Sequence, residues 1–169
     1  MKYKTMEIPE RMDRLPKYKG IAIPFSTLID DKGIPQFKLT NENVWIAKRD
    51  GLCSLCGEPL DYWKAFMVSE DEAESRIVWE NPQHEECLRY SFNVCPWLYY
   101  GKAKYTLAED IKVAGYVAFD AHPNRAESRE RPKKLGIYIC NNYKNIIVQK
   151  RYRVCKVSSP KRIEWIEGN

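Results

Sequence analysis

The sequence predicts an α+β fold with antiparallel strands, and three observations support this prediction. Apolar residues make up 44% of the 169 residues, enough for the core of one domain, or of one domain with an arm. Short segments with strand patterns are separated by turn signals, and other segments carry helix-capping patterns. The chain has neither the strand–helix alternation that builds a parallel sheet nor a glycine-rich phosphate loop.

The first 50 residues predict an arm, a hairpin and a short helix. Residues 1–20 contain two prolines and little apolar periodicity, so we expect an extended basic arm. The apolar segment 21–29 predicts a strand that turns at 30–33 and returns over 36–40. Asn41 can cap a helix that runs to about Arg49 and ends at Asp50-Gly51.

The middle of the chain predicts a second hairpin followed by a longer helix. Two extended stretches, 64–68 and 75–79, are joined by the acidic segment 69–74, which we expect to be a turn. Asn81-Pro82 then has the pattern of a helix start, with asparagine at the cap and proline in the first turn. This helix is expected to run to about Val94.

The last third predicts further short elements. Residues 106–115 have a capping-box helix pattern, 116–119 a strand pattern, and 120–134 form a polar basic loop. Residues 137–140 and 146–157 are expected to form a hairpin. In outline, the arm is followed by a core over 21–105 and by a basic α+β part, 106–169, packed on the same domain.

Four residues in the middle third have the spacing of zinc ligands. Cys53 and Cys56 form a Cys-x-x-Cys pair, and Gly57 lets the backbone curl under a metal. His84 and Cys87 lie three positions apart, on one face of the predicted helix start. A turn, a hairpin and a ligand-bearing helix form the layout of a treble-clef finger. With four protein ligands, one zinc ion would be structural and would not react.

The remaining cysteines are expected to lie outside this site. Cys95 follows Cys87 by eight residues, about 12 Å along a continuous helix, so it should pack in the core instead. Cys140 and Cys155 are expected to be thiols near each other in a reducing compartment. A thioredoxin-like redox role for Cys53 and Cys56 is disfavoured, because no βαβ unit surrounds them.

On these motifs the sequence resembles a family of small zinc-binding proteins from bacteriophages and actinobacteria that has no established activity. The family pattern runs from Cys-x-x-Cys-Gly-x-Pro-Leu through His-x-x-Cys to Cys-Pro-aromatic-Leu. The matching positions here are Cys53, Cys56, Gly57, Pro59, Leu60, Ala65, Phe66, Arg76, Glu80, Pro82, His84, Cys87, Cys95, Pro96 and Leu98. The resemblance implies zinc binding and a phage or mobile-element origin. One departure is the acidic stretch 70–74, where the family often has an apolar turn.

The uneven charge distribution predicts a polyanionic partner. The net charge is +5, but residues 124–169 hold twelve basic and four acidic residues, a net +8, whereas 68–89 hold seven acidic and two basic residues. Basic surface can also serve solubility alone, and both interpretations stay open. As nucleic-acid contacts we expect basic side chains of the last third and two tyrosines that could stack on bases: Arg125, Arg129, Arg131, Lys133, Lys134, Lys150, Arg151, Arg153, Tyr99 and Tyr100.

Two other functions are weighed against nucleic-acid binding. The acidic stretch 70–74 could instead bind a host protein, although a solvated charged turn is the simpler interpretation. An HNH-like nuclease needs a histidine base, and the only one besides His84 is His122, which follows Asp120 in a loop. We therefore expect no enzymatic activity. The charged N-terminus and the lack of a long apolar run predict a cytoplasmic protein with no membrane segment. The oligomeric state stays open.

Overall fold

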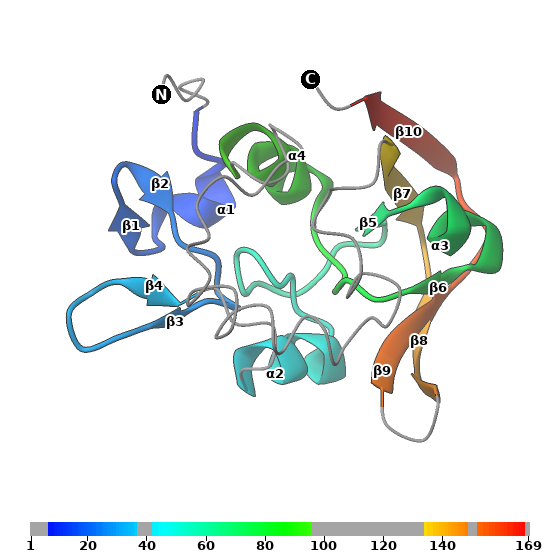
Figure 1. Ribbon diagram of the computed structural model, residues 1–169, viewed down its shortest axis with the longest axis horizontal. Coiled ribbons are helices and arrows are strands. Elements are labelled where there is room, and N and C mark those ends of the chain that lie inside the picture. Colours follow the sequence, from blue (N-terminus) through cyan, green and yellow to red (C-terminus); the bar gives the residue numbers. More distant parts are fainter. Residues whose placement is uncertain (1–6, 37–41, 96–133, 149–151, 168–169) are drawn as a thin grey trace, which may run out of the picture.

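The computed structural model describes residues 7–36, 42–95, 134–148 and 152–167 (Figure 1). Within these ranges the helices are α1 (Glu10–Asp13), α2 (Glu42–Asp50), α3 (Glu70–Ser75) and α4 (Glu85–Val94). The strands are β1 (Lys17–Tyr18), β2 (Ile21–Ala22), β3 (Leu28–Ile29), β4 (Pro35–Gln36), β5 (Lys64–Val68), β6 (Ile77–Val78), β7 (Lys134–Cys140), β8 (Tyr143–Val148), β9 (Tyr152–Val157) and β10 (Arg162–Glu167). All described strand pairs are antiparallel, so the α+β class is confirmed.

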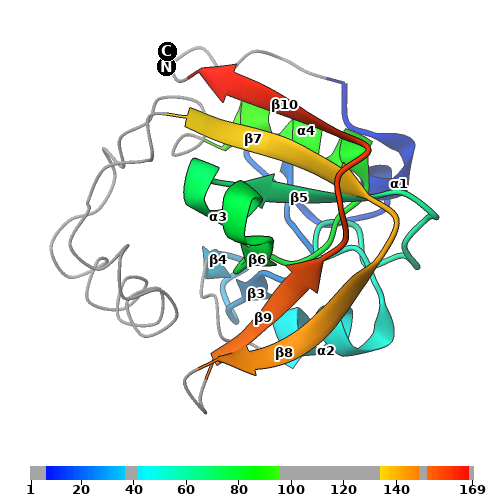
Figure 2. The same cartoon turned by 90° about the vertical axis from the view of Figure 1, so that its right-hand side faces the viewer.

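Two three-stranded sheets carry most of the described structure, in the orders β10-β7-β5 and β6-β9-β8. β7 continues into β8, and β9 into β10, so one long bent ribbon of two strands runs through both sheets (Figure 2). At the bend the Ser158 N–H donates to the Asn142 carbonyl at 3.0 Å, and the Lys161 N–H donates to the Ile139 carbonyl at 2.7 Å. The bend therefore keeps its backbone hydrogen bonds.

The sheet that contains β5 and β7 is apolar on both faces. One face packs against α4 through a cluster formed by Ala65, Met67, Leu88, Phe92, Leu135, Ile137 and Ile139. The opposite face packs against β6 and β9 through Phe66, Val68, Val78, Tyr138, Cys140, Cys155 and Val157. Alternate residues of each strand point to opposite faces, which is why neighbouring positions join different clusters.

The expected extended arm is wrong for the described residues 7–20. α1 forms a short turn in which the Met12 N–H donates to the Pro9 carbonyl at 2.7 Å. Met12 is fully buried, in a cluster with Ala22, Cys53, Leu55, Cys56, Cys87, Tyr90 and Val94. The side chain of Met12 thus anchors a segment whose charges suggested solvent exposure.

The expected hairpin between residues 64–68 and 75–79 is also wrong. β5 pairs with β7, and β6 pairs with β9, because the segment between them is the helix α3 and not a turn. Ser69 and Glu72 form a capping box, which explains why the acidic segment becomes helical. The treble-clef arrangement predicted from the sequence is therefore not confirmed.

Two further boundaries differ from the sequence predictions. Residues 81–83 precede α4 in an extended segment, and the Asn81 side chain donates to the Val44 carbonyl at 2.9 Å instead of capping α4. The single strand expected over 146–157 is two strands, β8 and β9, that pair with each other and not with β7. The helix predicted to end near Arg49 is confirmed as α2, and Gly51, with φ +68°, follows it.

Among the described residues, no helix is both long and apolar enough to cross a membrane.

Candidate metal centre

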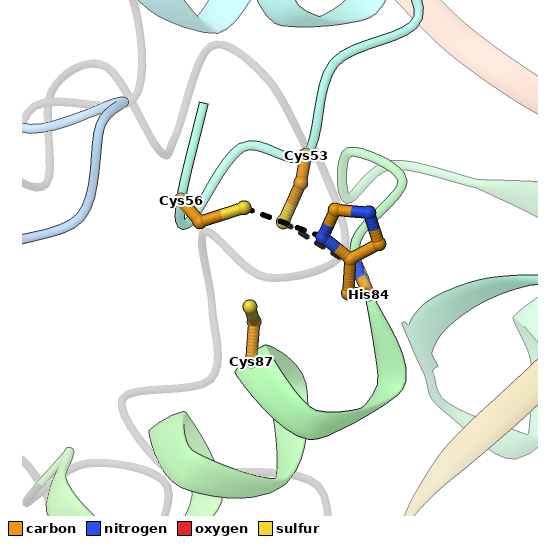
Figure 3. Close-up of side chains that lie close together, drawn as sticks. All are labelled: Cys53, Cys56, His84 and Cys87. Carbon is orange, nitrogen blue, oxygen red and sulfur yellow. Dashed lines mark hydrogen bonds between the residues drawn. The ribbon is translucent and has the colours of Figure 1, made fainter. Parts of the chain in front are cut away.

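Four side chains that the sequence predicts as metal ligands lie together. The sulfur atoms of Cys53, Cys56 and Cys87 and a ring nitrogen of His84 all lie within 4.8 Å of one another. Figure 3 shows the four side chains pointing toward a common centre, two from a turn and two from the start of α4. Each residue is at most 1% exposed. The cluster could hold one metal ion, as the sequence predicts.

Cys53 and Cys56 are presented by a tight turn over residues 52–60, called here the metal-binding turn. A β-bridge between Leu52 and Pro59 closes the turn, and the Cys53 N–H donates to the Glu58 carbonyl at 2.8 Å. The Gly57 N–H donates to the Cys53 carbonyl at 2.8 Å, and Gly57 has φ +77°. A residue with a β-carbon would be strained in this conformation, so the glycine allows the turn to close under the two thiols.

β5 holds the start of α4 beside this turn. Ala65 and Gln83 exchange two backbone hydrogen bonds, at 2.8 and 2.9 Å. The Ser54 N–H also donates to the Pro82 carbonyl at 3.3 Å. His84 is the N-cap residue of α4, and its ring makes no capping hydrogen bond because it points toward the thiols.

The distances within the cluster suit a tetrahedral ion. Sγ of Cys56 lies 3.3 Å from Nδ1 of His84, and all four ligand atoms lie within 4.8 Å of one another. With metal–ligand bonds of about 2.0–2.3 Å, neighbouring atoms of a tetrahedral site lie about 3.5–3.8 Å apart. Nε2 of His84 lies 3.0 Å from the Pro59 carbonyl, so this nitrogen can donate outward while Nδ1 faces the metal position.

The thiols and the imidazole shift one another's pKa. Hydrogen bonds from Cys56 and Cys87 lower the pKa of the Cys53 thiol, and hydrogen bonds to Cys53 and Cys56 raise the pKa of Cys87. Burial lowers the pKa of His84, but hydrogen bonds to Cys53 and Cys56 outweigh this effect and raise it to about 10. Negative charge therefore gathers on the Cys53 thiol, where a cation would be attracted.

A residue that the sequence analysis missed lies behind His84. The guanidinium of Arg11 contacts three elements of the site: Nη1 lies 3.2 Å from Nε2 of His84, Nη2 donates to Asp61 at 2.8 Å, and Nε donates to Glu86 at 2.8 Å. Arg14 adds a hydrogen bond to the Cys56 carbonyl at 3.2 Å. No local motif signals these contacts, because they join positions more than 40 residues apart.

The remaining cysteines lie outside the cluster of four ligands. Cys95 packs against the apolar cluster that lies between α4 and the sheet of β5 and β7. Cys140 and Cys155 are both buried in the cluster on the opposite face of the sheet. Burial raises the pKa of both thiols, that of Cys155 to about 11.

Most of the predicted nucleic-acid contacts lie outside the described residues. Lys134 and Arg153 are described, and both make intramolecular contacts. Lys134 lies 3.5 Å from Glu70 and 5.5 Å from the ring centroid of Trp165, and the Arg153 guanidinium lies 3.5 Å from the ring centroid of Trp45. The predicted contacts outside the described residues are Arg125, Arg129, Arg131, Lys133, Lys150, Arg151, Tyr99 and Tyr100, and Asp120 and His122 lie outside them as well.

Comparisons with known proteins give no match. No protein-family model matches the chain, and neither a curated protein nor a solved structure matches it.

Proposed function

We propose that this chain is a nucleic-acid-binding protein whose fold is stabilised by one structural zinc ion. The observation that carries the zinc assignment is the closed ligand set: four side chains converge, and none is more than 1% exposed. Three thiolates and one imidazole are a set that zinc prefers, whereas magnesium and calcium prefer oxygen ligands. A site filled by four protein ligands leaves no open position for a substrate, so the ion would support folding.

Zinc content tests the metal assignment directly. We expect one zinc per chain in the purified protein, and serine substitutions of Cys53, Cys56 or Cys87 should remove most of it. Cys95→Ser and Cys140→Ser are matched controls, because these thiols lie outside the cluster. Equal zinc content in all five variants would contradict the assignment.

The nucleic-acid role is supported by the charge of the chain. The net +8 of residues 124–169 is the kind of excess that phosphate backbones attract. The test is fluorescence anisotropy of labelled single-stranded and duplex oligonucleotides with the zinc-loaded protein, at low and at physiological salt. We expect binding that weakens steeply as salt increases. No binding at low salt would overturn the proposal.

An acidic helix favours a second candidate function, the binding of a host protein. Glu70, Asp71 and Glu74 are exposed on α3, so they could meet a basic partner surface. Glu72 cannot serve this purpose, because its carboxylate is buried and accepts hydrogen bonds from Ser69 and Trp79. A charge reversal should therefore change the three exposed residues and retain Glu72. Capture of the same partner by this variant and by the wild-type protein would count against this function.

A further inference from the structure

An exposed pair of aromatic rings lies directly after the metal-binding turn. The side chains of Tyr62 and Trp63 are 66% and 40% exposed, respectively, although rings of this size are usually buried in a core. Lys64 and Lys161 lie beside them, and Asn141 lies at the bend of the long ribbon. These five residues are called here the aromatic–lysine patch.

The patch is held rigidly by contacts across the fold. The two rings meet edge to face, with centroids 5.0 Å apart and an interplanar angle of 85°. Nδ2 of Asn141 donates to the Tyr62 hydroxyl at 3.1 Å, and Oδ1 of Asn141 accepts from Ser158 at the same distance. Nζ of Lys64 donates to the carbonyls of Tyr62 and Asn141, both at 2.9 Å. A surface ordered in this way loses little conformational entropy when it binds a ligand.

The patch is positively charged where the rings are exposed. Nζ of Lys161 lies 4.5 Å from the Trp63 ring centroid, and Nζ of Lys64 lies 5.8 Å from the Tyr62 centroid. Within the described residues, neither lysine forms an ion pair, and the adjacent Asp61 is bound by Arg11 at 2.8 Å. The ammonium of Lys64 has three N–H donors, and the two carbonyls use two, which leaves one for a ligand.

We propose that the aromatic–lysine patch binds single-stranded nucleic acid, with bases stacking on Trp63 and Tyr62 and phosphates contacting Lys64 and Lys161. This inference rests on the proposed nucleic-acid role and gives it a surface that the sequence analysis did not select. Rigid exposed rings beside cations match the two parts of a single strand, the flat base and the charged backbone. Duplex DNA keeps its bases stacked on each other, so it would use the lysines but not the rings. An acidic peptide would also use the lysines alone.

The test compares ring and lysine variants of the zinc-loaded full chain. The probe is a labelled oligothymidylate of about ten nucleotides, within the length that one small domain covers. Because Trp63→Ala removes the ring on which one base would stack, we expect it to weaken binding about five-fold or more. We expect the pair Lys64→Gln and Lys161→Gln to reduce the slope of log K against log salt by about 1.4, as two lost phosphate contacts should.

Matched controls come from elsewhere on the chain. Tyr18 is 37% exposed and has the Lys19 ammonium 5.3 Å from its ring centroid, but among the described residues no second ring lies beside it, so Tyr18→Ala controls for the loss of one exposed ring beside a lysine. Lys144 and Lys156 are exposed and lie opposite each other on β8 and β9, so their double change to Gln controls for charge. Every variant should keep its zinc content and its melting temperature, which establishes that it is folded.

A crosslink locates the contact independently of affinity. With iodouridine in the oligonucleotide, we expect ultraviolet light to attach it to the tryptic peptide that spans residues 50–64. Trp63→Ala should reduce that product, and the double change of Tyr62 and Trp63 to Ala should abolish it. If the wild-type protein, Trp63→Ala and the double lysine variant all bind the oligonucleotide equally well, this inference is overturned and the proposed function stands. Equal affinity for duplex and single strand would also overturn it. Wild-type protein that binds no oligonucleotide at low salt would overturn the proposed function itself.

Discussion

Arg11 lies against His84 of the candidate metal centre, with Nη1 3.2 Å from Nε2, although 73 positions separate the two residues. Arg11 also binds Asp61, just beyond the metal-binding turn, and Glu86 on α4. One side chain from the N-terminal segment thus joins the two elements that supply the ligands. With Nδ1 facing the ion, Nε2 carries the proton that the Pro59 carbonyl accepts, so Arg11 supports the site through its ion pairs to the two ligand-bearing elements and not as an acceptor for His84.

We expect Arg11→Ala to weaken zinc binding about ten-fold to a hundred-fold, as the loss of an outer contact usually does. Competition with a chromophoric chelator measures this affinity. Lys17→Ala is the control, because Lys17 is a cation of the same segment whose ion pair, with Asp13 at 3.1 Å, lies away from the ligands. Equal affinities of the two variants would show that Arg11 does not support the site.

Removal of the metal should release the N-terminal segment. Met12 is fully buried beside Cys53, Cys56 and Cys87, so loss of an ion that ties these three side chains together would loosen the packing that anchors it. We expect a strong chelator to make the chain sensitive to trypsin after Arg11, Arg14 and Lys17, and added zinc to restore protection. Mass spectrometry of the early fragments measures this change. Early cleavage at the same rate with and without zinc would argue that the segment folds independently of the site.

Gly57 and Gly51 provide a matched test of the metal-binding turn. Both have positive φ, +77° and +68°, so alanine at either position carries about 1 kcal/mol or more of backbone strain. A β-carbon at Gly57 would also lie 2.8 Å from the Phe25 ring, whereas at Gly51 it would meet no atom within 4 Å. We expect Gly57→Ala to reduce both thermal stability and zinc affinity, and Gly51→Ala to reduce only stability. Unchanged zinc affinity in Gly57→Ala would contradict this account.

Lys48 should make the free energy of unfolding depend on pH. Burial lowers its pKa below the ordinary value of 10.5, although Cys155 and Glu80 act in the opposite direction. Between the folded-state pKa and 10.5 the unfolded chain binds more protons, so the free energy of unfolding attributable to Lys48 should rise with pH in that window. At lower pH, both states are protonated and the full cost of burying the charge is present.

Urea denaturation of wild type and Lys48→Met across the alkaline range measures this effect. We expect the stability of the wild type relative to the variant to improve as the pH rises toward 10.5. Lys144→Met is the control, because Lys144 is exposed and should show no such trend. A difference that does not change with pH would mean that Lys48 is as easily protonated in the folded chain as in the unfolded one.

The ligand set could be predicted from the sequence because its information is local. A Cys-x-x-Cys turn and a His-x-x-Cys helix start each place two ligands on one side of a short element, whatever the rest of the chain does. The same holds for Gly57, whose positive φ follows from local turn chemistry. The prediction that Asn81 caps this helix is wrong, but the predicted site does not depend on it, because His84 and Cys87 still lie together at the start of α4.

The strand pairing was decided only in the tertiary structure. β5 is apolar on both faces, so its sequence does not specify which strand lies beside it. The place expected for β6 is occupied by β7, which begins 66 positions after the end of β5. The burial of Met12 and the contact of Arg11 with His84 likewise join distant positions. So do the contacts of Tyr62 with Asn141 and of Trp63 with Lys161. Spacing along the chain determines which residues can bind one ion together, whereas competition among all strands and apolar side chains determines what surrounds them.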